Sequence, residues 1–204
     1  GEYALEVGEL MNVGNQLINI ETIKALKIIP GNHILEIGMG NGCFVEQILK
    51  DSTIKYTGID HSEEMVNQAC KRNQNFIQSK QAFFLKGNAE SLPFTDNTFD
   101  NVFTVNTLYF WEHPHAILNE IHRVLKPEGQ LVMAIRPKYI MEEYPFVKYN
   151  FTMYNKEDIS ELFANHPFRI NAIWEKQEPE QDILGQMLPV CGLYVSVEKT
   201  ITGL

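Results

Sequence analysis

The sequence predicts an α/β fold built around a mostly parallel sheet, and two observations lead to this. Short apolar, β-branched runs alternate with helix-length segments from about residue 33 to 135, and a glycine-rich turn follows the first of these runs. Strands that alternate with helices at this spacing are typical of right-handed βαβ units. The 204 residues are enough for one domain with a sizeable core.

The first expected element is a helix over residues 9–27, interrupted at Gly14 and ended by Pro30 and Gly31. A strand over residues 33–37 follows. Three glycines at alternate positions come directly after it, and residues 43–50 are predicted as a helix. Glycine permits positive φ and close approach of a ligand, and a helix start offers unpaired N–H groups. We expect a ligand cradle here, at the carboxyl edge of the sheet.

The glycine spacing excludes two common nucleotide-binding patterns. The dinucleotide pattern requires a third glycine where Cys43 or Val45 stands. The phosphate-loop pattern requires Gly-Lys-Ser/Thr, which does not follow.

A second strand over residues 55–60 ends in Asp60, whose carboxylate could accept both hydroxyls of a ribose. Ser62 is expected to cap the next helix, with Met65 one turn in. A third strand leads to Asn88, and a fourth, apolar enough to be buried on both faces, ends at Asn106. Residues 121–135 predict a helix, a Pro/Gly turn and a fifth strand.

The last third of the chain predicts a different arrangement. Residues 137–149 are aromatic and irregular, and a helix is expected over residues 155–164, capped by Asn155. Residues 168–174 and 190–198 alternate in polarity and predict two strands. The acidic, polar stretch between them, residues 177–188, is expected to be a loop.

Three motifs carry a resemblance to a known family. The run Glu36-x-Gly-x-Gly-x-Gly, the segment Asp60-His61-Ser62-Glu63-Glu64-Met65 and the segment Arg123-Val124-Leu125-Lys126-Pro127 resemble motifs of class I S-adenosylmethionine-dependent methyltransferases. The matches lie in order between about residues 33 and 135, half of the chain. They are most similar to the bacterial small-molecule branch (methyltransferase type 11, ubiquinone/menaquinone methyltransferase-like).

The resemblance implies a Rossmann-like seven-stranded sheet of order 3-2-1-4-5-7-6, with strand 7 antiparallel and helices on both faces. It implies a single methyltransferase domain over residues 1–204. Within it we expect an N-terminal helical lid (residues 1–30), a cofactor-binding core (residues 33–136), and an acceptor-side segment with a closing hairpin (residues 137–204).

The resemblance also implies which residues contact S-adenosylmethionine and its product S-adenosylhomocysteine. They are Glu36, Gly38, Met39, Gly40, Gly42, Asp60, His61, Met65, Asn88, Ala89, Glu90, Asn106 and Leu108. Two positions depart from the family pattern. Asn88 stands where an acid usually accepts the adenine amino group, and Glu128 replaces a glycine at the start of the fifth strand.

Methyl transfer from a sulfonium is an in-line displacement, in which positioning supplies most of the catalysis. Tyr109 and His113 are candidate bases, with Tyr139 and Tyr144 as alternatives. His113 could equally serve only to begin a helix at Pro114. We expect a small, partly apolar acceptor to lie among three segments: the aromatic cluster of residues 109–111, the aromatic segment of residues 139–149, and the N-terminal helix near Met11.

Composition limits the partners. The formal net charge of −9 argues against a nucleic-acid substrate. No stretch is long and apolar enough to span a membrane, no secretion signal is apparent, and the three scattered cysteines are typical of reduced thiols, so a cytoplasmic location is expected. We expect no metal, and the oligomeric state stays open. Two alternatives remain: methylation of a protein or nucleic acid, and a non-catalytic S-adenosylmethionine-binding protein.

Overall fold

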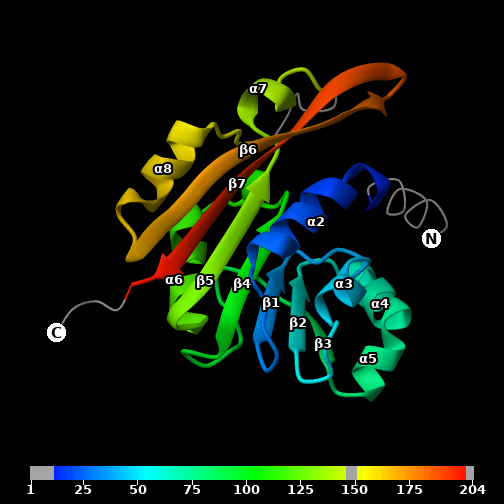
Figure 1. The fold of residues 1–204 in the computed structure, drawn as a ribbon, viewed down its shortest axis with the longest axis vertical. Coiled ribbons are helices and arrows are strands. Elements are labelled where there is room, and N and C mark those ends of the chain that lie inside the picture. The colour runs from blue at the N-terminus through cyan, green and yellow to red at the C-terminus, as the bar shows by residue number, and fades with distance from the viewer. Residues whose placement is uncertain (1–11, 146–150, 201–204) are drawn as a thin grey trace.

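The computed structural model describes residues 12–145 and 151–200 and contains a seven-stranded sheet of order β3-β2-β1-β4-β5-β7-β6 (Figure 1). The strands are β1 (His33–Ile37), β2 (Lys55–Asp60), β3 (Ala82–Lys86), β4 (Phe99–Val105), β5 (Leu125–Ile135), β6 (Phe168–Ile183) and β7 (Gln186–Lys199). Strands β1 to β5 pair in parallel, and β7 is antiparallel to both β5 and β6. The predicted strand order and the direction of strand 7 are confirmed.

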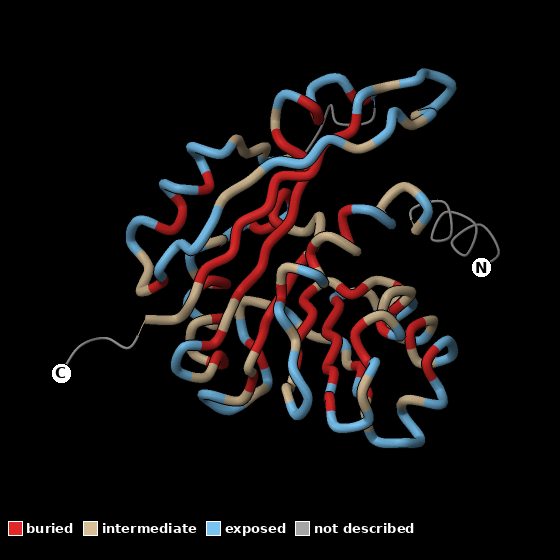
Figure 2. The backbone as a smooth tube through the Cα atoms, in the orientation of Figure 1, coloured by how far each residue is buried: buried red, intermediate tan, exposed pale blue. Residues whose placement is uncertain are grey.

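Helices cover both faces of this sheet, as predicted. They are α2 (Gln16–Ala25), α3 (Val45–Ile48), α4 (Glu63–Arg72), α5 (Gln74–Gln78), α6 (Pro114–Val124), α7 (Lys138–Met141) and α8 (Lys156–Ala164). In the views of Figures 1 and 2, α2 to α5 lie over one face and α6 and α8 over the other, while the strands between them are largely buried. None of the helices in the described part of the chain is long and apolar enough to cross a membrane.

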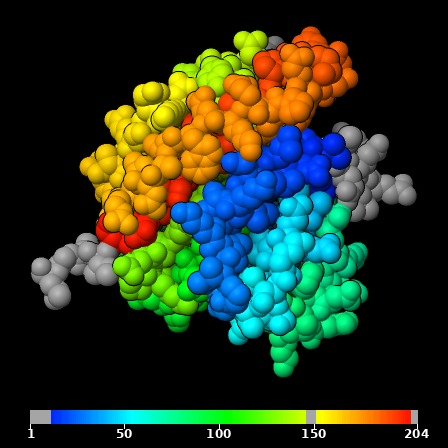
Figure 3. All heavy atoms as spheres, in the orientation of Figure 1, coloured from blue at the N-terminus to red at the C-terminus, as the bar shows by residue number. Residues whose placement is uncertain are grey.

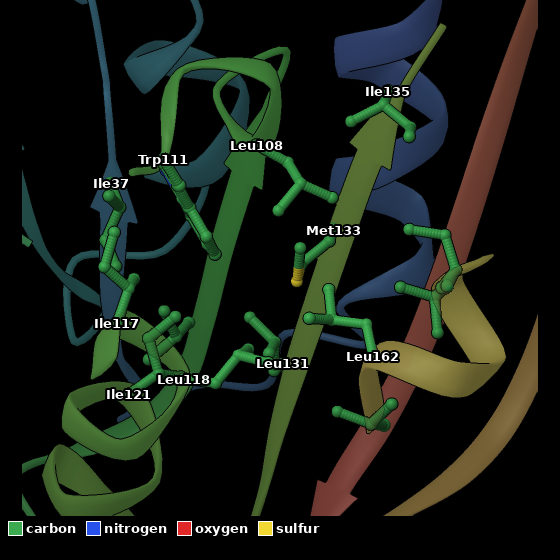
Figure 4. Close-up of a cluster of buried hydrophobic side chains, with 14 of the residues drawn as sticks. Ile37, Leu108, Trp111, Ile117, Leu118, Ile121, Leu131, Met133, Ile135 and Leu162 are labelled. Carbon is green, nitrogen blue, oxygen red and sulfur yellow. The ribbon is translucent and has the colours of Figure 1, made fainter. Parts of the chain in front are cut away.

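Each face of the sheet packs a separate hydrophobic cluster, because successive side chains of a strand point to opposite faces. Figure 4 shows Ile117, Leu118 and Ile121 of α6 beside Leu131 and Met133 of β5. Neighbouring residues of the same strands, including Ile34, Phe103 and Val132, pack on the other face with α2, α3 and α4. Burial on both faces explains the continuously apolar runs in the sequence.

Two predicted helices are shorter than expected. In the N-terminal segment residues 12–14 are helical, Asn15 forms a turn, and α2 begins at Gln16, so the expected interruption lies next to Gly14. The predicted helix over residues 43–50 shrinks to Val45–Ile48. The chain leaves it at Leu49, whose φ and ψ of −83° and 57° are not helical.

The predicted loop over residues 177–188 is wrong. β6 and β7 continue through it as a hairpin, with Gln177 opposite Cys191 and Gln181 opposite Leu188. The chain reverses at Leu184 and Gly185, both with positive φ. The polar residues of this stretch lie on β6, a strand at the edge of the sheet, and many of them are exposed to solvent. Polar residues are therefore compatible with a strand here, and they did not indicate a loop.

Glu128, which departs from the family pattern, has a φ of 63°. A glycine adopts this conformation without strain, whereas other residues are uncommon there. Glu128 therefore holds a conformation that a glycine at this position could adopt without strain.

Candidate functional site

A cavity of about 770 Å³ opens at the carboxyl ends of the parallel strands. Its walls come from five regions of the chain: the N-terminal segment, the turn after β1, the end of β2, the segment after β3 and the segment after β4. The lining residues are Asn12, Asn15, Asn19, Glu36, Ile37, Gly38, Met39, Gly40, Asn41, Phe44, Ile59, Asp60, His61, Ser62, Met65, Gly87, Asn88, Ala89, Glu90, Val105, Asn106, Thr107, Phe110, Trp111, Glu112 and Ile117. Eleven of the thirteen predicted cofactor residues are among them.

The glycine turn forms one wall of this cavity. Gly38 and Gly40 have φ of 75° and 56°, a region in which side chains are strained. A Cβ added to Gly40 would meet no other atom within 4 Å, so this glycine faces open space. The backbone N–H of Gly38 donates to the Ile59 carbonyl at 2.8 Å, which ties the turn to β2.

Asp60, at the end of β2, is buried and held in one orientation. Its Oδ2 accepts from the Gly40 N–H at 3.0 Å and its Oδ1 from the Ser62 N–H at 2.9 Å. Each carboxylate oxygen has two lone pairs, so both can accept a further hydrogen bond from the cavity. Ser62 also caps α4, because its hydroxyl accepts from the Met65 N–H at 3.3 Å.

Glu36 is also buried, and the Tyr56 hydroxyl donates to its Oε2 at 2.5 Å. Burial raises the pKa of Glu36 to about 7; the Tyr56 hydrogen bond opposes this shift and the charge of Asp60 adds to it. The carboxyl group of Glu36 therefore changes its protonation state near neutral pH.

The segment after β3 supplies Asn88, Ala89 and Glu90. The Oδ1 of Asn88 accepts from the Glu90 N–H at 2.9 Å, so the side chain shapes its own turn. Glu90 reaches His113, with 3.0 Å between Oε1 and Nδ1. His113 is exposed and does not line the cavity, but this pair places it at the cavity's edge.

Four of the predicted cofactor contacts and first-choice bases do not line the cavity. Tyr109 and Leu108 are buried in the core, and Gly42 packs against α4, where an added Cβ would lie 2.7 Å from Asn73 Nδ2. The Tyr109 hydroxyl donates to Asn106 Oδ1 at 2.9 Å and accepts from the Arg136 N–H. Burial also raises the pKa of Tyr109, which argues against its use as a base. His113 is the fourth.

The aromatic side chains that reach the cavity are fewer than expected. Phe110 and Trp111 line it, together with Phe44, which the sequence did not indicate. Tyr144 is buried in the core, and Tyr139 lines a separate hollow with Glu175. Met11, Phe146 and Tyr149 lie outside the described residues.

Sequence reasoning missed three asparagines, Asn12, Asn15 and Asn19, although it expected the N-terminal helix at the mouth of the site. Their spacing of three and four residues is that of one helix face, which was the available signal. The described residues contain no group of three or more His, Cys, Asp or Glu side chains placed to hold a metal ion.

These residues fit S-adenosylmethionine. Gly40 leaves open the space that a Cβ would fill, and Asp60 presents a fixed, buried carboxylate. Phe44, Met39 and Met65 add apolar surface. The cavity combines an apolar lining with a few fixed polar groups, as small-molecule sites do.

Comparison with known proteins agrees with this geometry. Residues 35–133 match the model of a methyltransferase domain. An uncharacterized methyltransferase of Bacillus subtilis, YdaC, is 33% identical over 132 residues, which are 64% of this chain and 71% of that protein. A fatty-acid O-methyltransferase of Mycolicibacterium smegmatis is 31% identical over 57% of this chain, but the match spans only 42% of that enzyme.

Solved structures show the same fold at low sequence identity. A methyltransferase in complex with the Trm112 methyltransferase activator of Haloferax volcanii has a TM-score of 0.79 at 18% identity, covering 98% of this chain and 97% of that one. A SAM-dependent methyltransferase from Methanosarcina mazei has a TM-score of 0.66 at 21% identity, covering 85% and 95%.

Proposed function

Because the chain belongs to the class I S-adenosylmethionine-dependent methyltransferases, we propose that it methylates a small organic acceptor. The observation that carries the proposal is that the glycine turn, Asp60, Phe110 and Trp111 all line one cavity. The relatives named O-methyltransferases support a small acceptor. The net charge of −9 supports it too, since a nucleic acid would be repelled.

In this proposal the wall formed by Gly38, Gly40 and Asp60 binds the cofactor. Asp60 accepts from the ribose hydroxyls, and the open space at Gly40 admits the methionine part. Bound S-adenosylmethionine supplies a methyl group that is already activated by a positive sulfur. The chain's own contribution is to orient two reactants and exclude water.

Phe110 and Trp111 hold the acceptor in this proposal, and Glu90 and His113 form the candidate pair for removing a proton. The two side chains are in hydrogen-bond contact, and Glu90 faces the cavity. An imidazole or a carboxylate within hydrogen-bond reach of an acceptor hydroxyl can take up its proton as a general base.

The test is transfer of label from methyl-labelled S-adenosylmethionine in a cell extract. The purified protein should label compounds below about 1 kDa, and Asp60→Ala should reduce this label. Label in the protein or nucleic-acid fraction would favour a macromolecular acceptor. Tight cofactor binding with no labelled product would favour a non-catalytic binding protein.

A further inference from the structure

The N-terminal segment contributes three asparagines to the cavity, one of them at the break in the helix at Asn15 and one on each side of it. Asn12 precedes the break, and Asn19 follows it in α2. In the space-filling view α2 lies across the molecule between β6 and α3 (Figure 3). The segment therefore forms one wall of the site while belonging to none of the sheet's strands.

The first contact that holds this segment is a pair of hydrogen bonds accepted by the Gly14 carbonyl. Nη2 of Arg136, from the end of β5, donates to it at 3.2 Å, and Nε2 of Gln181 on β6 donates at 3.1 Å. The Nη1 of Arg136 bonds Oε1 of Glu178 on β6 at 2.5 Å. The side chains of Arg136 and Glu178 are only 6% and 3% exposed. One arginine thus joins β5, β6 and the N-terminal segment.

The second contact acts on the next residue. Oδ1 of Asn15 accepts from Nδ2 of Asn106 at 3.0 Å, and Oδ1 of Asn106 accepts from the Tyr109 hydroxyl at 2.9 Å. That hydroxyl also accepts from the backbone N–H of Arg136. Both contacts therefore lead back to Arg136, and both act at the break in the helix.

We propose that Arg136 is a positioning residue that holds residues 12–20 closed over the cofactor cavity and so limits how fast S-adenosylhomocysteine leaves. The inference rests on the proposed function. It adds that release requires the bonds of Gly14 to Arg136 and Gln181 to break, so the N-terminal segment opens away from the hairpin. In many enzymes such an opening step, and not the chemistry, limits turnover.

Two features of the contact suit this role. The planar guanidinium has separate N–H groups for two acceptors, whereas a lysine offers a single point charge. Oε2 of Glu178 is buried and has no hydrogen-bond partner among the described residues. The Glu178 carboxylate is thus held mainly by Arg136. Because Glu178 lies on the β6–β7 hairpin, a movement of the hairpin would also move the Arg136 side chain.

The experiment measures dissociation of labelled S-adenosylhomocysteine from the wild-type protein and from Arg136→Met/Glu178→Met. The double variant removes both charges, because a lone buried carboxylate would strongly destabilise the fold. We expect dissociation to become at least about tenfold faster, which corresponds to a loss of ~1.4 kcal/mol in the free energy that holds the segment closed. Amide exchange of residues 12–20 should accelerate in the same variant, with or without the ligand.

Arg169→Met is the matched control, because it breaks an exposed β6–β7 pair with Glu198 that does not contact the N-terminal segment. It should change neither dissociation nor exchange. Arg136→Lys keeps the charge but lacks the planar, forked guanidinium, so we expect an intermediate dissociation rate; this variant provides the test if the double variant does not fold.

The proposal is overturned if a folded variant releases the ligand at the wild-type rate and exchanges residues 12–20 no faster. If wild-type protein does not bind S-adenosylhomocysteine, the proposed function fails. The exchange of residues 12–20 in the free protein then still shows whether Arg136 holds the segment.

Discussion

At the scale of single residues, Asp60 is the group on which cofactor affinity should depend most. Its carboxylate is fixed by two backbone N–H groups and could accept two ribose hydroxyls. Hydrogen bonds to charged groups contribute roughly 1.5–3 kcal/mol each. Asp60→Ala should therefore weaken binding in calorimetry by about 10- to 150-fold for each ribose hydrogen bond that it removes. Asp96→Ala, which removes an exposed acid outside the cavity, serves as the control; equal affinity in both variants would contradict the ribose assignment.

Glu36 gives the molecule a pH dependence. In the unfolded chain this carboxyl loses its proton near pH 4.5, and in the folded protein only near pH 7, because of its burial. Between these values the folded state binds more protons, so Glu36 lowers stability as the pH rises from about 4.5 to 7.

The expected contribution of Glu36 is up to about 3 kcal/mol, from ~1.4 kcal/mol per pH unit. Denaturant unfolding between pH 5 and 8 should show wild type losing stability relative to Glu36→Gln, which has no proton to lose. Parallel stability curves for the two proteins would show that Glu36 ionises normally.

At the scale of elements, the effect of a side chain in the glycine turn after β1 has two parts, backbone strain and loss of ligand contact. A comparison with a glycine outside the turn distinguishes them. Gly31 and Gly40 both have positive φ, and an added Cβ meets no atom within 4 Å at either. Gly31→Val and Gly40→Val should therefore suffer similar losses of stability, about 1–2 kcal/mol. Only Gly40→Val fills the cavity, so only it should abolish binding of S-adenosylhomocysteine in calorimetry. Normal binding by this variant would place the cofactor elsewhere.

The hairpin turn of β6 and β7 contains a residue that does not suit its conformation. Leu184 has a φ of 53° and is 77% exposed, so it is strained without packing gain. Asparagine tolerates this conformation in tight hairpin turns. Leu184→Asn should raise the free energy of unfolding by about 0.5–1 kcal/mol. Met187→Asn, exposed on the same hairpin without positive φ, should not; a gain in both would point to lost surface hydrophobicity instead.

These elements also show what the sequence could predict. The central strands β1, β2 and β4 and the second half of β5 are largely buried and mostly apolar, so their residue pattern allowed them to be predicted. The half of the hairpin nearest its turn contains polar residues such as Gln177 and Gln181. These residues are identified as part of a strand only by their pairing with β7. Pairing between distant residues leaves no local pattern.

The site divides in the same way. Gly38, Gly40 and Asp60 lie in short motifs whose spacing is set by one strand and one turn, so they could be predicted. Asn15 lies in the cavity because Asn106 bonds it from 91 residues away. The hydroxyl of Tyr109, a predicted candidate base, accepts from the backbone N–H of Arg136 after the next strand, and the residues next to Tyr109 in the sequence do not indicate this contact.

At the scale of the whole molecule, cofactor and fold should stabilise each other. A ligand that binds only the folded state at 100 times its Kd adds about 2.7 kcal/mol. For a chain of this size that corresponds to a rise in Tm of about 5–10 °C. Thermal unfolding with S-adenosylhomocysteine should show this rise in the wild type and little or none in Asp60→Ala. An equal rise in both would mean that the ligand binds without Asp60.

The position of β7 between β5 and β6 also dictates an order of assembly. During synthesis β5 emerges long before Gln186–Lys199, the segment that pairs with its free side. Until then β5, with its run Leu131 to Ile135, exposes an unpaired apolar edge, the kind of surface through which chains associate. A ribosome paused after β6 would therefore hold an aggregation-prone intermediate, and synthesis of β7 is needed to cover the free edge of β5.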